Sequence, residues 1–143
     1  MKTKIPILLL VFAFALAVLF GCLYRNMKNK YEYKQYLTDQ MFLYNLHELS
    51  LELPPSSDGT YSAEQSAEIW RCLYFCETML DYTSYADDEK LDKIMYRLYS
   101  WYELDVLSER IDSELVDAMV GMAVNLEVPA YVDRVYDMLF AEE

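Results

Sequence analysis

The feature that most constrains this chain is a run of twenty residues, Ile5–Tyr24, without a charged or strongly polar side chain. A helix of that length spans about 30 Å, which matches the hydrocarbon core of a bilayer. Thirteen of these residues are Leu, Ile, Val or Phe, and together such side chains favour insertion by at most about 4–8 kcal/mol. Basic residues flank both ends, as lipid headgroups prefer. The run therefore predicts a transmembrane helix.

Residues 1–27 can attach the protein to a membrane in two ways. An ordinary cleaved signal peptide is disfavoured, because the small-residue pairs lie inside the apolar run rather than after it. Residues 19–22 read Leu-Phe-Gly-Cys and resemble the lipobox of bacterial lipoproteins, with Cys22 as the lipidation candidate, although Phe20 stands where a small residue is usual. In an uncleaved signal-anchor, Cys22 is instead an ordinary apolar residue near the helix end.

The orientation of the body depends on the basic residues around the run. Lys2 and Lys4 precede it, whereas Arg25 and three lysines follow it, so the positive-inside counts nearly cancel. The short N-terminal tail favours a cytoplasmic amino terminus, and a long downstream domain translocates largely regardless of its charge. We therefore expect a single-pass protein of the cell membrane with an extracytoplasmic body.

The net charge of -12 is divided unevenly along the chain. Residues 1–34 hold six basic side chains and one acid, a charge of +5, whereas residues 35–143 hold six basic side chains and 23 acids, a charge of -17. Nucleic-acid binding needs cationic surface and is excluded for so acidic a body. About half of the body is apolar, which is enough to bury a core and excludes disorder as its main state.

Apolar periodicity predicts an all-α protein, an N-terminal transmembrane helix followed by a compact domain of about five helices. We assign residues 28–53 to a juxtamembrane amphipathic helix, residues 54–62 to a turn-rich linker and residues 63–143 to an acidic helical bundle that packs on residues 36–53. The first of these helices has an apolar face with steps of four, three and four residues, made by Phe42, Leu46, Leu49 and Leu53.

Capping signals place the later helices. Ser62 followed by Gln65 fits a capping box, for a helix that ends near residues 81–83. Asp87 and Asp88 supply a cap for the next helix, and a broadly apolar helix is expected over residues 112–127. Pro129 suits the first turn of a last helix.

Two cysteines and a methionine form the one candidate for soft-metal or redox chemistry. Cys72 and Cys76 are four residues apart on one helix, and Met79 follows three residues later, so the three could offer ligands to Cu(I). They also fall within or beside the apolar stripe of that helix, where buried Cys and Met are ordinary core residues. We favour the core interpretation and expect neither a metal nor a cofactor.

No catalytic motif is visible in the sequence. His47 is the only histidine, without zinc-like spacing or a glycine-rich nucleophile turn, and we expect it to be solvated. The acids at residues 87–92 lack the glycine-centred loop of an EF-hand and suit a helix start better than a cation site. We therefore expect that the protein is not an enzyme.

Fourteen tyrosines make the most unusual residue count. Tyr and Trp bury large areas while keeping a polar tip, so they serve both cores and protein interfaces. Four aromatics on one helix are the candidate interaction surface, namely Tyr96, Tyr99, Trp101 and Tyr102.

The leading hypothesis is a membrane-anchored, non-catalytic protein-interaction module at the cell envelope. Its expected partners are membrane lipid and either another protein or a second copy of the chain. One alternative is a lipoprotein lipidated at Cys22 that binds an envelope ligand. A second alternative is a membrane-bound metal or redox carrier that uses Cys72 and Cys76.

Overall fold

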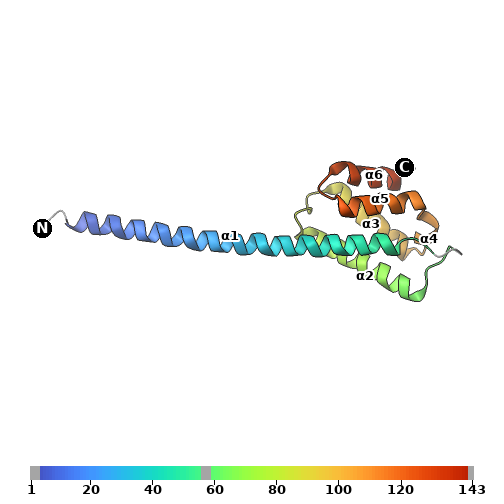
Figure 1. Ribbon diagram of the computed structural model, residues 1–143, viewed down its shortest axis with the longest axis horizontal. Helices are drawn as coiled ribbons and strands as arrows, with labels where there is room; N and C mark the ends of the chain where they lie inside the picture. The colour runs from blue at the N-terminus through green and yellow to red at the C-terminus, as the bar shows by residue number, and fades with distance from the viewer. Residues whose placement is uncertain (1–3, 56–58, 142–143) are drawn as a thin grey trace. The chain divides into compact units, whose positions relative to one another are not determined.

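The computed structural model describes residues 4–55 and 59–141, with side chains described from Phe12 onward. Those residues form six α-helices and one short 3₁₀ helix, with no strand among them, which confirms the all-α fold class (Figure 1). Two compact units make up the chain, Met1–Tyr36 and Leu37–Glu143. Helix α1 (Lys4–Glu52) contributes to both.

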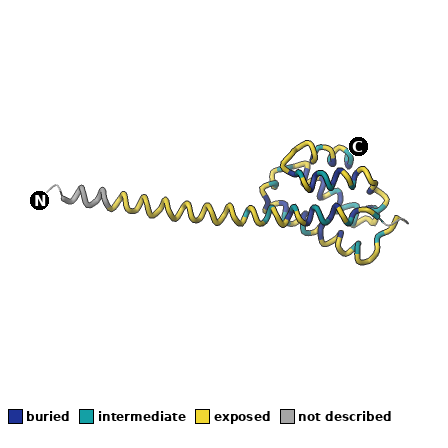
Figure 2. The backbone as a smooth tube through the Cα atoms, viewed as in Figure 1, coloured by how far each residue is buried: buried dark blue, intermediate teal, exposed yellow. Residues whose placement is uncertain are grey.

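The first unit is the N-terminal part of α1. All its side chains from residue 12 to residue 34 are exposed (Figure 2). Among the residues with described side chains, no helix is long and apolar enough to cross a membrane. The predicted anchor, residues 1–27, begins with residues 1–11, whose side chains lie outside the described part of the chain.

The second unit buries an apolar core. The predicted apolar face lies fully inside it, with Phe42, Leu46 and Leu49 of α1 and Leu53, the residue after its end, all completely buried. Helix α2 (Ala63–Met79), which continues into the 3₁₀ helix η1 (Leu80–Tyr82), adds buried residues to the same core. Helix α3 (Glu89–Glu103) packs against both α2 and α6 (Pro129–Phe140), and α6 also packs against α5 (Ser113–Val124).

A short helix, α4 (Leu107–Arg110), separates α3 from α5. The sequence did not predict it, because four residues are too few for a periodic pattern to show. Asp105 adopts a left-handed backbone, with φ of 58°, in the turn that precedes α4. Helix α5 is also shorter than expected, since it ends at Val124 and the Asn125 side chain donates a hydrogen bond back to the carbonyl of Gly121.

One half of the predicted capping box is confirmed and the other half is wrong. The Ser62 hydroxyl accepts a hydrogen bond from the Gln65 backbone N–H at 3.1 Å. The Gln65 side chain does not return to Ser62 but donates to the carbonyls of Glu52 and Pro54, both at 2.8 Å. Carbonyls at and just after the end of α1 have no helical partner of their own, and the Nε2 donors of Gln65 satisfy two of them.

Candidate interaction surface

One exposed face of α3 forms a groove with the end of α6. The residues of α3 that line this groove follow Lys93 at three, four, seven and eight positions. Helical periodicity places residues with these spacings on one side of the helix. The groove has a volume of about 310 Å³ and is lined by Lys93, Tyr96, Arg97, Ser100, Trp101, Leu104 and Phe140. We call it the α3–α6 groove.

Cationic side chains of α3 lie against aromatic rings of α6 beside the α3–α6 groove. The Arg97 guanidinium carbon lies 4.4 Å from the ring centroid of Phe140, and the Phe140 ring stacks on Tyr136 with centroids 4.5 Å apart. The Lys93 ammonium lies 6.0 Å from the Tyr136 centroid. These distances are in the range of cation–π contacts, so the two cations that line the groove, Lys93 and Arg97, lie against aromatic rings of α6.

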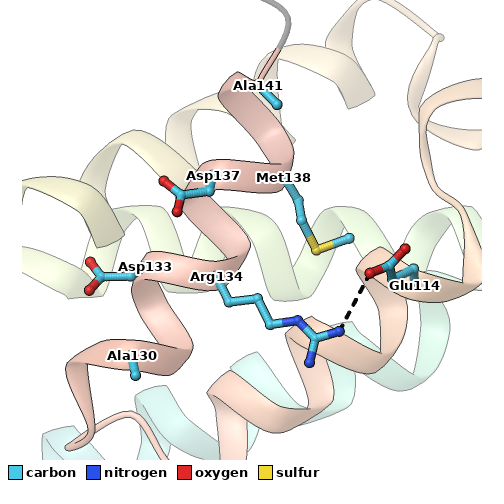
Figure 3. Close-up of a pocket in the computed structure, with 7 residues that line it drawn as sticks. All are labelled: Glu114, Ala130, Asp133, Arg134, Asp137, Met138 and Ala141. Carbon is cyan, nitrogen blue, oxygen red and sulfur yellow. Dashed lines mark ion pairs between the residues drawn. The ribbon is translucent and has the colours of Figure 1, made fainter.

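The charged side chains that line this groove differ from those of most of the body. Among the residues that the structure describes, the lining contains two cations and no acid, although residues 35–143 carry 23 acids and six basic residues. A hollow between α5 and α6 shows the contrast, because it is lined by Glu114, Asp133 and Asp137 with one cation, Arg134. Figure 3 shows Arg134 reaching from α6 toward Glu114 of α5, with 3.6 Å between Nη2 and Oε1.

A second hollow adjoins the α3–α6 groove. It has a volume of about 430 Å³ and shares Arg97 and Trp101 with the groove, while Arg110 and Asp112 add one cation and one acid. Trp101 is half-buried, so its ring lines two hollows at once. The surface lined by Trp101 and Arg97 therefore extends from α3 to the end of α4.

The four aromatics predicted as one interaction surface lie on two sides of α3. Tyr96 is 69% exposed and lines the α3–α6 groove with Trp101. Tyr102 faces α2 instead, where its hydroxyl lies 3.1 Å from the Ser66 hydroxyl. Tyr99 is half-buried and hydrogen-bonded to Glu103, which raises the pKa of the phenol. The structure brings together Tyr96 and Trp101 and separates them from the other two.

Sequence reasoning missed the cations and Phe140. The sequence did contain a signal for a cationic face on this helix. Lys90, Lys93 and Arg97 follow one another at steps of three and four and are half of the basic residues in the body. Lys90 forms an ion pair with Asp133 of α6, which raises the pKa of its ammonium. The contribution of Phe140 depends on the packing of α6 against α3, which no local pattern encodes.

Both cysteines of the metal and redox candidate lie in the core. Cys72 and Cys76 are buried free thiols, and desolvation raises the pKa of each. Met79 is half-buried beside them in the sequence. Thiolates are the form that binds metals and attacks disulfides, so this environment disfavours both activities. Within the described part of the chain, no three His, Cys, Asp or Glu side chains cluster in a way that could hold a metal ion.

The expectation of a solvated His47 is wrong. The residue is half-buried, and its Nδ1 atom is buried without a hydrogen-bond partner. It lies on α1 between the fully buried Leu46 and Leu49, so its ring is partly covered by the same packing.

Of the acids at residues 87–92, Asp88 caps α3 by accepting from the N–H groups of Lys90 and Leu91, both at 3.0 Å.

Large apolar side chains are also exposed on α1 and on α2. On the side of α1 opposite its buried face, large side chains are more than 40% exposed at Leu37, Met41, Tyr44 and Leu51. On α2, the rings of Trp70 and Tyr74 stack with centroids 5.3 Å apart and are also exposed.

Comparisons with protein families, curated proteins and solved structures find no match to this chain.

Proposed function

We propose that this chain is a non-catalytic protein-interaction module, held at the cell envelope by a single membrane segment. The observation that carries the proposal is the α3–α6 groove, which presents one exposed ring, Tyr96, two half-buried rings, Trp101 and Phe140, and two cations on a predominantly acidic body. Tyr, Trp and Arg are the residues that most often dominate the energy of protein interfaces. The exposed apolar side chains of α1 and α2 add further groups suited to contact with protein.

The membrane segment of this proposal is the uncharged run Ile5–Tyr24. The basic residues that follow it would lie at the headgroups, while the acidic body would be repelled from anionic lipid. We propose the extracytoplasmic side for the body, for the reasons given by the short N-terminal tail. On an extracytoplasmic body, the α3–α6 groove would be accessible to proteins in or near the cell envelope.

The environments of the reactive side chains support a binding role over catalysis. The thiols of Cys72 and Cys76 are held neutral by burial, and His47 has one ring nitrogen buried without a partner. A catalytic nucleophile or base needs access to substrate and a matched partner. The same burial speaks against the metal or redox carrier.

The lipoprotein alternative concerns how the module is attached. Cys22 is exposed on α1, as a residue must be to receive lipid. Mass spectrometry of the mature chain separates the two forms, because an acylated Cys22 as first residue identifies the lipoprotein. An intact N-terminus that precedes residue 22 identifies the signal-anchor.

Site-specific crosslinking in native membranes tests the interaction module. A photoreactive phenylalanine analogue at position 96 would report on the α3–α6 groove, and the same analogue at position 82 is its control. Tyr96 and Tyr82 are 69% and 68% exposed, so the two probes have equal access to solvent. We expect a discrete partner band from position 96 that is absent from position 82. No band at either position, or the same bands at both, would contradict the proposal.

A further inference from the structure

We infer that a cavity formed by the start of α2, the end of α3 and α4 binds a small aliphatic diamine. The cavity has a volume of about 480 Å³, which is in the range of small-molecule sites. Its lining shares no residue with that of the α3–α6 groove, so the inference goes beyond the proposed function. The residues that carry the inference are Tyr61, Ser66, Tyr102, Asp105, Leu107 and Glu109.

The charge of the lining favours a cationic ligand. Asp105 and Glu109 both line the cavity and are exposed to solvent. Among the lining residues that the structure describes, none is basic, and Arg110, the next residue in the chain, lines the hollow beside the α3–α6 groove instead. A carboxylate has about four acceptor positions, so each acid can accept from a ligand in addition to any neighbour within the protein.

Three hydroxyl groups of the cavity have already used their protons. The Tyr61 hydroxyl donates to the Leu53 carbonyl at 2.8 Å. The Tyr102 hydroxyl donates to the Ser66 carbonyl at 3.2 Å, so in the 3.1 Å contact between the two side chains the Ser66 hydroxyl is the donor. These oxygens keep acceptor lone pairs only. They therefore suit a ligand that brings its own N–H donors.

Asp105 stands where the end of a helix favours glycine. It is the left-handed residue, with φ of 58°, of the Schellman motif that closes α3. Its N–H donates to the Tyr102 carbonyl, and the N–H of Val106 donates to the Trp101 carbonyl, both at 3.0 Å. A carboxylate at this position also faces the negative end of the helix dipole. An ammonium group bound at Asp105 would compensate the charge of the carboxylate and that of the helix end together.

The remaining lining indicates an aliphatic ligand with two charges. Leu107, which is 2% exposed, lines the cavity with the rings of Tyr61 and Tyr102, so a chain of methylene groups has apolar surface to pack on. Two ammonium groups match the two carboxylates. A metal ion fits less well, because no three His, Cys, Asp or Glu side chains of the described chain cluster in a way that could hold one.

Isothermal titration calorimetry with the full chain in neutral detergent at low salt tests the inference. The probe is 1,5-diaminopentane, and 1,5-pentanediol is a control of the same length without charge. We expect saturable binding of one diamine per chain that weakens as salt is raised, and no saturable binding of the diol. Asp105→Asn and Glu109→Gln should each weaken the binding at least about threefold, because a charge-assisted hydrogen bond is lost.

Asp117→Asn is the matched charge control. Asp117 is exposed on α5 and does not line the cavity, so its removal should change the affinity less than about twofold. Equal weakening by Asp117→Asn would assign the binding to net charge. Equal binding of the diamine and the diol would assign it to apolar contact. Either result would overturn the local site.

Asp105→Gly separates a role in binding from a role in the fold. Glycine adopts the left-handed backbone readily and removes the acid from the helix end. Without ligand, the variant should therefore raise the Tm by about 1–4 °C, measured by circular dichroism, while it weakens the binding of the diamine. A lower Tm would show that the carboxylate stabilises the empty fold, and would overturn the inference drawn from its position.

Two further probes distinguish other sources of positive charge. N-acetyl-lysine methylamide carries a single ammonium group and should bind at least about threefold more weakly than the diamine. Equal or tighter binding would overturn the diamine in favour of a lysine side chain, and displacement of the diamine by equimolar Ca²⁺ would do so in favour of a metal ion. If the diamine fails to bind while crosslinks at position 96 capture a protein, this inference fails and the interaction module stands. Diamine binding without such crosslinks would have the opposite meaning.

Discussion

The Gln65 side chain connects the ends of two helices. Its amide donates to the carbonyls of Glu52 and Pro54, one at the end of α1 and one in the linker. Gln65→Ala should lower the free energy of unfolding by about 1–3 kcal/mol, because two carbonyls lose their donor. Urea denaturation of the full chain, followed by circular dichroism, measures this loss.

Gln40→Ala is the control for Gln65→Ala. Gln40 is exposed on α1, and alanine has a helix propensity at least as favourable as that of glutamine, so this variant should retain the stability of the unmodified protein. Gln65→Met should be about as destabilising as Gln65→Ala, since its side chain has a similar length and helix propensity to glutamine but no donor for the carbonyls. Full stability of Gln65→Met would contradict the role assigned to the amide donors.

Tyr61 gives the fold a dependence on alkaline pH. Its hydroxyl donates to the Leu53 carbonyl at 2.8 Å, and burial raises the pKa of the phenol from 10.0 to about 12. Between these values the unfolded chain loses this proton while the folded chain keeps it, so the free energy of unfolding falls as pH rises. Because the residue is only half-buried, we expect a contribution of about 1 kcal/mol between pH 9 and pH 12.

Tyr61→Phe isolates the contribution of Tyr61 to that slope. The variant lacks the ionisable hydroxyl, so its stability should fall less steeply over the same pH range than that of the unmodified protein. Tyr85 and Tyr99, whose pKa values are also raised, are present in both proteins and cancel in the comparison. Equal slopes in urea denaturation at pH 9, 10, 11 and 12 would contradict the assignment to Tyr61.

At the scale of the element, Asp88 decides where α3 begins. Its carboxylate accepts from two backbone N–H groups, which have no other helical partner. Asp88→Ala should cost about 1 kcal/mol of stability, whereas Asp88→Asn should retain most of it, because asparagine is an equally good N-cap. The neighbouring exposed Asp87 serves as control, and Asp87→Ala should be close to neutral. Equal losses at both positions would show that charge rather than capping is responsible.

The helices and their caps were the most predictable features, because they depend on neighbours in sequence. The buried face of α1 follows from the spacing of Phe42 and Leu46, and the cap from Asp88 itself. The interaction surface was only partly predictable. Tyr96 and Tyr99 are three residues apart, yet the packing of α3 against α2 and α6 leaves only the first on the groove. Which side of a helix stays exposed is decided by its partners.

At the scale of the whole molecule, the sequence joins an apolar, basic N-terminal segment to an acidic body. Insertion of the run Ile5–Tyr24 is favoured by at most about 4–8 kcal/mol, and one arginine near the bilayer centre costs about 2.5–3.5 kcal/mol. A single arginine substitution therefore leaves the free energy of insertion favourable or close to zero. The double variant Phe14→Arg/Ala15→Arg costs about 5–7 kcal/mol and should offset most or all of the gain.

Carbonate-washed membranes measure this balance directly. The unmodified chain should remain in the membrane pellet, and Phe14→Arg/Ala15→Arg should move to the supernatant. The control variant Leu37→Arg/Met41→Arg introduces the same charges at exposed positions of the acidic unit and should stay in the pellet. A pelleted Phe14→Arg/Ala15→Arg chain would show that the apolar run is not what retains the protein. Release by an added Cys22→Ser substitution would then assign attachment to an acyl chain, since one or two such chains supply the membrane affinity that the run had lost.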